Sequence, residues 1–218
     1  MVDYFKQIRI QIHKKMKFKY FENPESFSVI SDENVCCDLC NKEKICFEAD
    51  LFYGEDEIDF ICPECLQSGA LKNKDIITCE GDISELKRQI KNKNQHLSDQ
   101  EIHELAVIKT SELETTTPKL ITWQDWFWPC SVGDYCTFIG YGSKEFYQSL
   151  SNSESVKQFF SDSIYFSQKE ESDCNYLWDE VLPEKPIKNY HQSEDYGTLF
   201  YVFKCLHSDK IVTVWDCD

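Results

Sequence analysis

Two pairs of cysteines have the spacing of a metal site. Cys37 and Cys40 form one Cys-x-x-Cys turn, Cys62 and Cys65 form a second, and 21 residues separate the two turns. Each turn brings its two sulfur atoms toward one point, and two such turns supply the four thiolates that are typical of a structural zinc site. Because four thiolates leave no coordination position open, we expect one zinc ion that stabilises the fold and does not catalyse a reaction.

The residues beside these turns suit that geometry. Asn41 follows the first pair, where a residue that tolerates left-handed backbone is useful, Pro63 lies inside the second pair, and Gly69 follows it. Cys36 is an alternative first ligand, because it lies next to Cys37. We prefer Cys37, since its two-residue spacer to Cys40 is the standard one.

The chain has twelve cysteines in all, so a second metal site has to be considered. Without a secretion signal a disulfide scaffold is not expected, because cytosolic thiols stay reduced. One interpretation of the remaining cysteines is that they are buried free thiols, which is the commoner case. The other is a second metal site, whose convergence the spacing cannot establish. Its candidate ligands are Cys130, Cys136, Cys205 and His207.

A run of carboxylates lies between the two cysteine turns. Residues 48–59 contain six acidic and no basic side chains. One interpretation is the solvated rim of a hairpin, and the other is a docking surface for a basic partner. Paired catalytic carboxylates are disfavoured, because a loop does not project two carboxyl groups across a cleft. The six candidate partner-binding residues are Glu48, Asp50, Glu55, Asp56, Glu57 and Asp59.

The charge of the whole chain limits its partners. Lys plus Arg number 23 and Asp plus Glu number 39, which gives a net charge of −16. Residues 1–21 carry +5 and the remainder −21, so nucleic acid is repelled by most of the chain and a basic protein is attracted. No apolar run reaches the roughly 20 residues that span a bilayer, and the N-terminus lacks a secretory signal. We therefore expect a cytoplasmic location and no membrane partner.

Several elements are expected to position these residues. Strands are predicted at 47–53 and 58–61, between the cysteine turns, and a closing hairpin is predicted from 198–205 and 211–215. Capping boxes, in which an oxygen-bearing residue precedes Glu by three positions, predict helices that begin near Asp82, Ser98 and Ser151.

The segment 121–129 is exceptionally aromatic, with Trp123, Trp126, Phe127 and Trp128 close together. We interpret it mainly as core, with an exposed part as an interface anchor as the alternative. The fold class that follows is α+β, with a small zinc ribbon of two Cys-x-x-Cys turns packed on a mixed domain that ends in an antiparallel β-hairpin. The predicted parts are a basic N-terminal extension at 1–20, a zinc-ribbon-like module at 21–72 and an α+β domain at 73–218, the last two forming one compact unit.

These motifs together resemble those of the CbrC-like proteins. The resemblance covers most of residues 18–216, and residues 1–15 lie outside it. Many members have a cysteine and a glycine shortly after the Cys205 position, where this chain has His207 and Ser208, which counts against an additional metal turn there. The matching stretches are Phe18–Pro24, Cys37–Lys42, Phe60–Ala70, Thr117–Pro118, Trp123–Gln124, Cys130, Gly133–Cys136, Phe138–Gly140, Leu199–Phe200, Cys205–His207 and Trp215–Asp216.

The resemblance implies a function in toxin resistance. The founding member is named for tolerance to a DNA-cleaving colicin, and some members are similar to immunity proteins. We therefore expect a zinc-stabilised cytoplasmic immunity protein that binds and neutralises a basic toxin domain through an acidic surface, and no catalytic residues. The alternatives are a metal-dependent enzyme of unknown reaction and a zinc-ribbon regulatory or nucleic-acid-associated protein.

Overall fold

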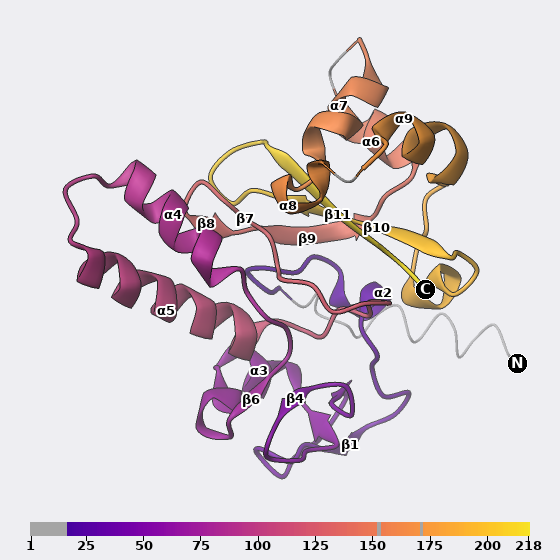
Figure 1. Cartoon of the computed structure of the whole chain (residues 1–218). Coiled ribbons are helices and arrows are strands. Elements are labelled where there is room, and N and C mark those ends of the chain that lie inside the picture. The colour runs from indigo at the N-terminus through magenta and orange to yellow at the C-terminus, as the bar shows by residue number, and fades with distance from the viewer. Residues whose placement is uncertain (1–16, 152–153, 171) are drawn as a thin grey trace, which may run out of the picture.

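A three-stranded antiparallel sheet forms the middle layer of the protein (Figure 1). The structure, a computed structural model, describes residues 17–151, 154–170 and 172–218. Strands β9 (Thr137–Tyr141), β10 (Thr198–Lys204) and β11 (Ile211–Cys217) lie in the order β11-β10-β9. The fold is thus a mixture of helices and strands, and the pairings between its named strands are antiparallel.

The closing hairpin is confirmed. Strands β10 and β11 pair from Thr198 with Cys217 through to Lys204 with Ile211. Alternate residues of β10 point to opposite faces: Leu199, Tyr201 and Phe203 enter one hydrophobic cluster, whereas Phe200 and Val202 enter another. Because both faces are covered, these strands are mostly apolar and do not alternate regularly between apolar and polar residues.

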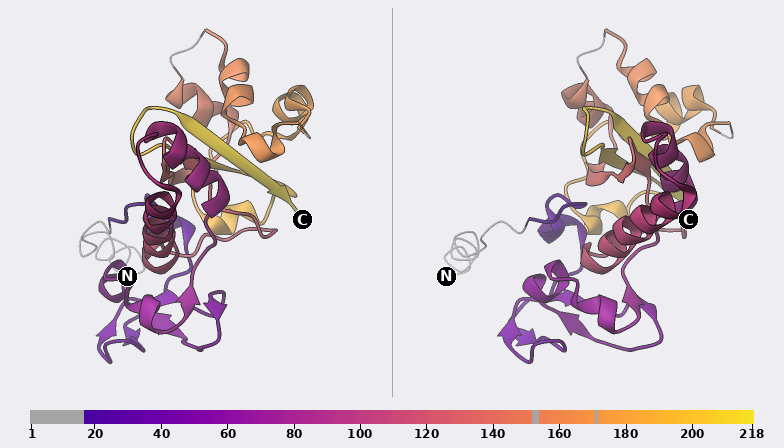
Figure 2. Two further views of the ribbon diagram at one scale, coloured as in Figure 1. Left: turned by 60° about the vertical axis from the view of Figure 1, so that its left-hand side comes forward. Right: turned by 90° about the vertical axis from the view of Figure 1, so that its left-hand side faces the viewer.

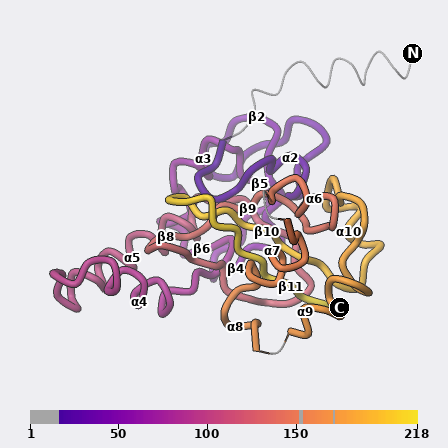
Figure 3. The backbone as a smooth tube through the Cα atoms, turned by 90° about the horizontal axis from the view of Figure 1, so that it is seen from above, coloured from indigo at the N-terminus to yellow at the C-terminus, as the bar shows by residue number. Residues whose placement is uncertain are grey.

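The helices predicted to begin near Asp82 and Ser98 are present and form an antiparallel hairpin beside the sheet. Helix α4 (Ile83–Lys93) begins at Asp82, whose carboxylate accepts a hydrogen bond from the Glu85 amide. Helix α5 (Asp99–Thr116) begins at Ser98 with the complete reciprocal capping box. Figure 3 shows this helical hairpin reaching away from β10 and β11.

Short elements around the cysteines form a separate layer, which we call the cysteine module (residues 30–77), below the sheet in Figure 2. Its own hydrophobic clusters centre on Phe47, Ile61 and Leu66 and on three cysteines. Its elements are β1 (Val35–Cys36), β2 (Glu43–Lys44), β3 (Phe47–Glu48), β4 (Tyr53–Gly54), β5 (Phe60–Ile61), α3 (Pro63–Gln67), η1 (Ala70–Asn73) and β6 (Ile76–Ile77).

The strand predicted at 47–53 is wrong in its length. Strand β3 ends at Glu48, and the Phe52 amide donates to the Ala49 carbonyl to form a turn. The chain then resumes as β4, which pairs with β6 and not with β5. The predicted strand at 58–61 is likewise reduced to β5, because only Phe60 and Ile61 find partners in β3. The alternation of apolar residues in the sequence did not reveal that the chain leaves β5 after β3 and pairs with β6 instead.

The capping box predicted at Ser151 is also misplaced. Ser151 ends helix α6 (Lys144–Leu150), and Ser155 begins helix α7 (Val156–Ser163) by accepting from the Gln158 amide. Ser151 has Glu154 three positions later and Ser155 has Gln158 there, and the chain uses the second serine to begin the helix. The remaining elements are α2 (Pro24–Phe27), β7 (Cys130–Ser131), β8 (Asp134–Tyr135), α8 (Phe166–Lys169), α9 (Cys174–Tyr176), η2 (Leu177–Val181) and α10 (Tyr190–Ser193).

The aromatic segment is only half core. Trp128 is 1% exposed and donates from Nε1 to the Cys136 carbonyl, and Trp126 donates to Asp216 Oδ2 at 3.1 Å. Trp123 and Phe127, in contrast, are 41% and 56% exposed. The core interpretation is therefore wrong for these two rings, because the segment has no regular structure that would turn all four toward the sheet.

Contacts link the predicted parts to one another. Phe21 forms a bridge with Phe138 of β9, so the start of the predicted module packs in the main cluster, whereas β6, beyond residue 72, pairs inside the cysteine module. The predicted N-terminal extension lies mostly outside the described residues. Within the described part of the chain, no helix is both long and apolar enough to cross a membrane.

Candidate metal centre

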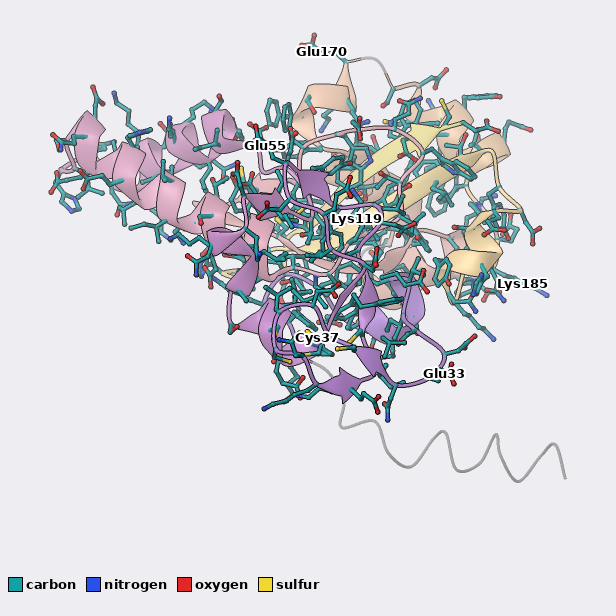
Figure 4. The ribbon with its side chains drawn as sticks, turned by 90° about the horizontal axis from the view of Figure 1, so that it is seen from below. Glu33, Cys37, Glu55, Lys119, Glu170 and Lys185 are labelled. Carbon is teal, nitrogen blue, oxygen red and sulfur yellow. The ribbon has the colours of Figure 1, made fainter. Side chains whose placement is uncertain are left out.

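The four predicted ligands lie together in the cysteine module. The Sγ atoms of Cys37, Cys40, Cys62 and Cys65 are all within 4.8 Å of one another. Those of Cys40 and Cys62 are 3.8 Å apart. A tetrahedral ion with metal–sulfur bonds of about 2.3 Å has sulfur–sulfur edges of about 3.8 Å, so the thiols have the spacing of a four-thiolate metal site. In Figure 4 the sulfur atoms gather around the labelled Cys37.

Backbone hydrogen bonds build the two turns. In the first turn the Asn41 amide donates to the Cys37 carbonyl at 2.8 Å, and the Cys37 amide donates to the Lys42 carbonyl at 3.0 Å. Asn41 has a φ of 55° and Gly69 one of 71°, the left-handed conformations that their positions after the turns required. Cys36, which pairs with Glu43 in the β1–β2 ladder, is exposed and outside the sulfur cluster.

The cluster favours ionised sulfur at Cys37 and neutral thiols at Cys62 and Cys65. Burial alone would raise the pKa of Cys37, but amide donors, above all that of Cys62, outweigh it and lower the pKa to about 7. Burial raises the pKa of Cys62 to about 11 and that of Cys65 further still. Several thiolates this close together repel one another, and a bound cation removes that repulsion.

A fifth cysteine supports the cluster from behind. Cys46 is fully buried against it, and its amide donates to Ser31 Oγ. Burial raises the pKa of Cys46 to about 12, and its sulfur is not part of the group formed by the four close sulfurs. On the outer side Lys44 Nζ lies 3.1 Å from Glu64, a carboxylate inside the second cysteine turn.

Five of the acidic residues lie in the segment between β3 and β5, which contains the short strand β4 and which we call the acidic loop (residues 50–59). Asp50, Glu55, Asp56, Glu57 and Asp59 are exposed in it, whereas Glu48 is half-buried in β3. The loop is tied to the first cysteine turn: Asp38 Oδ2 accepts the amides of Asp59 and Phe60, both at 2.8 Å. The first cysteine turn therefore holds the C-terminal end of the acidic loop.

The second candidate metal site does not assemble. Cys130 Sγ lies 3.6 Å from the Tyr165 hydroxyl, Cys205 Sγ lies 3.6 Å from the Ser131 carbonyl, and His207 Nε2 lies 3.2 Å from Asp134 Oδ2. Elsewhere in the described ranges no other group of three or more His, Cys, Asp or Glu ligand atoms comes as close as the four sulfurs.

The three cysteines of this group are instead buried thiols. Burial raises the pKa of Cys130 to about 12 and that of Cys136 well above its usual range, so both are neutral thiols in these buried positions. His207 forms part of a different arrangement, in which buried Asp134 also pairs with Lys109.

A cavity that sequence reasoning missed lies where the cysteine module meets the aromatic segment. It measures about 270 Å³ and is lined by Tyr53, Cys79, Lys119 and Trp126 among others. The Lys119 ammonium lies 3.8 Å from the centre of the Tyr53 ring, and burial lowers the pKa of Lys119. The sequence signal for this cavity was Lys119, a single lysine at the start of the apolar segment after Pro118. Only the fold shows that Lys119 lies beside Tyr53.

Comparison with known proteins agrees with the motif pattern. The Uncharacterised protein family (UPF0167) matches the chain over residues 16–217. No solved structure matches the chain significantly. Because the match spans nearly the whole sequence, including both cysteine turns, the chain belongs to UPF0167, which is the CbrC family.

Proposed function

We propose that this protein is a zinc-stabilised cytoplasmic immunity protein, in which a zinc ribbon presents the acidic loop to a basic toxin domain and thereby neutralises it. The observation that carries the proposal is the fixed exposure of five carboxylates on a loop bound to a cysteine turn. A loop whose shape is already set loses little conformational entropy when it binds a partner.

Apolar anchors adjoin the acidic loop. A groove of about 450 Å³ runs beside it, lined by Leu51, Tyr53 and Trp123 among others. Leu51 and Trp123 are 47% and 41% exposed. Stable interfaces combine a few large apolar anchors with a charged rim, and this face of the protein offers both.

Charge supports a basic partner. Toxins that cleave nucleic acid need basic clefts, so an acidic inhibitor is steered toward them and occupies the space of the phosphates. A net charge of −16 provides the long-range part of this attraction, and the acidic loop provides the local part.

The cysteine cluster supports zinc in a structural role. Four sulfur ligands in two short turns are the preferred set for Zn²⁺, and they fill its tetrahedral coordination. The alternative of a metal-dependent enzyme loses its main support, because Cys130, Cys136, Cys205 and His207 do not meet at one point.

The test is co-expression with the basic product of the neighbouring gene, followed by titration of the purified pair at low and high salt. We expect cells that express both proteins to grow normally, and we expect the affinity of the complex to fall as the salt concentration rises. The triple variant Glu55→Lys, Asp56→Lys, Glu57→Lys should weaken binding by about a hundredfold, because three attractive contacts become repulsive.

A matched variant separates a local contact from net charge. Glu154→Lys, Glu170→Lys, Glu180→Lys makes the same change in charge at exposed positions outside the acidic loop, in or next to α7, α8 and η2. It should retain most of the affinity. Equal weakening by both triple variants, salt-independent binding, or the absence of a complex would each refute the proposal.

A further inference from the structure

A basic groove lies on the side of the molecule formed by α4, α8 and the turn between β7 and β8. It measures about 640 Å³, within the range of small-molecule sites. Four basic side chains line it, Arg88, Lys93, Lys169 and Lys210, against the two acidic ones Glu85 and Asp162. Four against two leaves +2 in a chain whose net charge is −16, so this groove has the opposite sign to the protein as a whole.

Three of the four cations have no carboxylate partner among the residues that the structure describes. Arg88 is neutralised by Glu85, to which it donates two hydrogen bonds of 2.6 Å. Lys93 Nζ contacts only the Val132 carbonyl, at 3.4 Å, and Lys169 and Lys210 form no ion pair with any residue that the structure describes. The groove therefore holds three ammonium groups with hydrogen-bond donors to spare.

The other described lysines are of both kinds: seven lie within 3.1 Å of a carboxylate and eight form no ion pair with a described residue. What marks the groove is that three unpaired lysines line one hollow. Unpaired like charges that line one groove repel each other, and an anion in the groove turns that repulsion into attraction. The lysines with carboxylate partners are Lys19, Lys44, Lys91, Lys109, Lys144, Lys157 and Lys204.

An aromatic ring borders the same groove. Phe166, the first residue of α8, is 51% exposed. The guanidinium carbon of Arg88 lies 6.0 Å from the centre of the Phe166 ring. The Tyr165 ring supports it from within, with a distance of 4.7 Å between ring centres. Phe166 thus presents an open, fixed face on which a planar group can stack.

We propose that this groove binds a phosphorylated small molecule with a planar aromatic part, such as a nucleotide. The ammonium groups of Lys93, Lys169 and Lys210 donate to phosphate oxygens, and the Phe166 ring stacks on the aromatic part. This site is independent of the acidic loop and extends beyond toxin binding.

Titration calorimetry of the full chain tests the site, with pyrophosphate as the phosphate probe, ADP as the probe that adds a base, and adenosine as the uncharged control. Ionic strength is held constant with NaCl. We expect saturable binding of both anions with Kd at or below about 1 mM, tighter for ADP, and no binding of adenosine. If neither anion gives a saturable signal at about 5 mM, the site is refuted.

Two variants locate the binding. The double variant Lys169→Ala, Lys210→Ala should lower the affinity for both anions by roughly tenfold or more. The matched control Lys72→Ala, Lys74→Ala changes exposed lysines in and beside η1 and should leave both affinities unchanged. Phe166→Ala should lower the affinity for ADP by roughly fivefold and leave the affinity for pyrophosphate unchanged. Equal losses in the two lysine variants would overturn the location, and an unchanged affinity of Phe166→Ala for ADP would overturn the role of the ring.

Discussion

At the scale of single residues, the two adjacent cysteines show how backbone geometry selects a ligand. Cys36 and Cys37 differ by one position at the end of β1, and neighbouring side chains of an extended chain point to opposite sides. Cys36 therefore faces solvent, whereas Cys37 is fully buried among the sulfurs. Their chemistry is identical, and direction alone decides which one belongs to the cluster.

This difference leads to a prediction about metal content. Cys37→Ser removes one of the four thiols and should reduce bound metal to well below one ion per chain, together with a loss of roughly 3 kcal/mol or more in the free energy of unfolding. Cys36→Ser should leave both unchanged. Metal analysis and thermal unfolding of the two variants provide the measurement, and metal loss in Cys36→Ser with retention in Cys37→Ser would reverse the assignment.

At the scale of elements, the β7–β8 hairpin carries a residue that its turn does not favour. Ser131 pairs with Asp134, so Val132 and Gly133 form a two-residue turn with φ values of 56° and 77°. Both values are left-handed, which suits an Asn-Gly pair and penalises the β-branched Val132. The exposed Val132 side chain lines the basic groove, so the strain is located beside the proposed phosphate site.

The strain can be measured directly. Val132→Asn should raise the free energy of unfolding by about 1 kcal/mol, because asparagine adopts the left-handed conformation at lower cost. Val107→Asn is a suitable control, since Val107 is 43% exposed against 41% for Val132 but lies in the right-handed backbone of α5. Chemical denaturation of both variants decides the matter, and a stabilisation no larger than that of the control would exclude strain at the turn.

At the scale of the whole molecule, two kinds of core hold the chain together. Residues on both faces of the three-stranded sheet form large hydrophobic clusters, whereas the cysteine module has only small ones. So small a core stabilises a module weakly by itself, and a metal ion is a common remedy. The cysteine module is therefore the part whose stability should depend on metal.

Metal removal should consequently loosen one part and spare the other. With a strong chelator, amides such as those of Cys37 and Asn41 should exchange hydrogen about a hundredfold faster, while those of β10 and β11 keep their protection. Hydrogen exchange followed by mass spectrometry distinguishes the two regions. Equal loss of protection in the sheet and the cysteine module, or no change in either, would contradict this division.

The sequence by itself determined the features that depend on local spacing. The two cysteine turns, the helix starts at Asp82 and Ser98 and the closing hairpin all follow from residues a few positions apart, because capping, turn geometry and strand alternation act over that range. The family pattern follows from the same motifs.

Only the tertiary structure decided what depends on distant residues. It separated Cys130 from His207, turned Trp123 and Phe127 outward, and chose Ser155 over Ser151 as the start of α7. It also brought Lys93, Lys169 and Lys210, which are far apart in the sequence, to one groove. Such placements result from the packing of whole elements against one another, and no rule of local spacing contains that information.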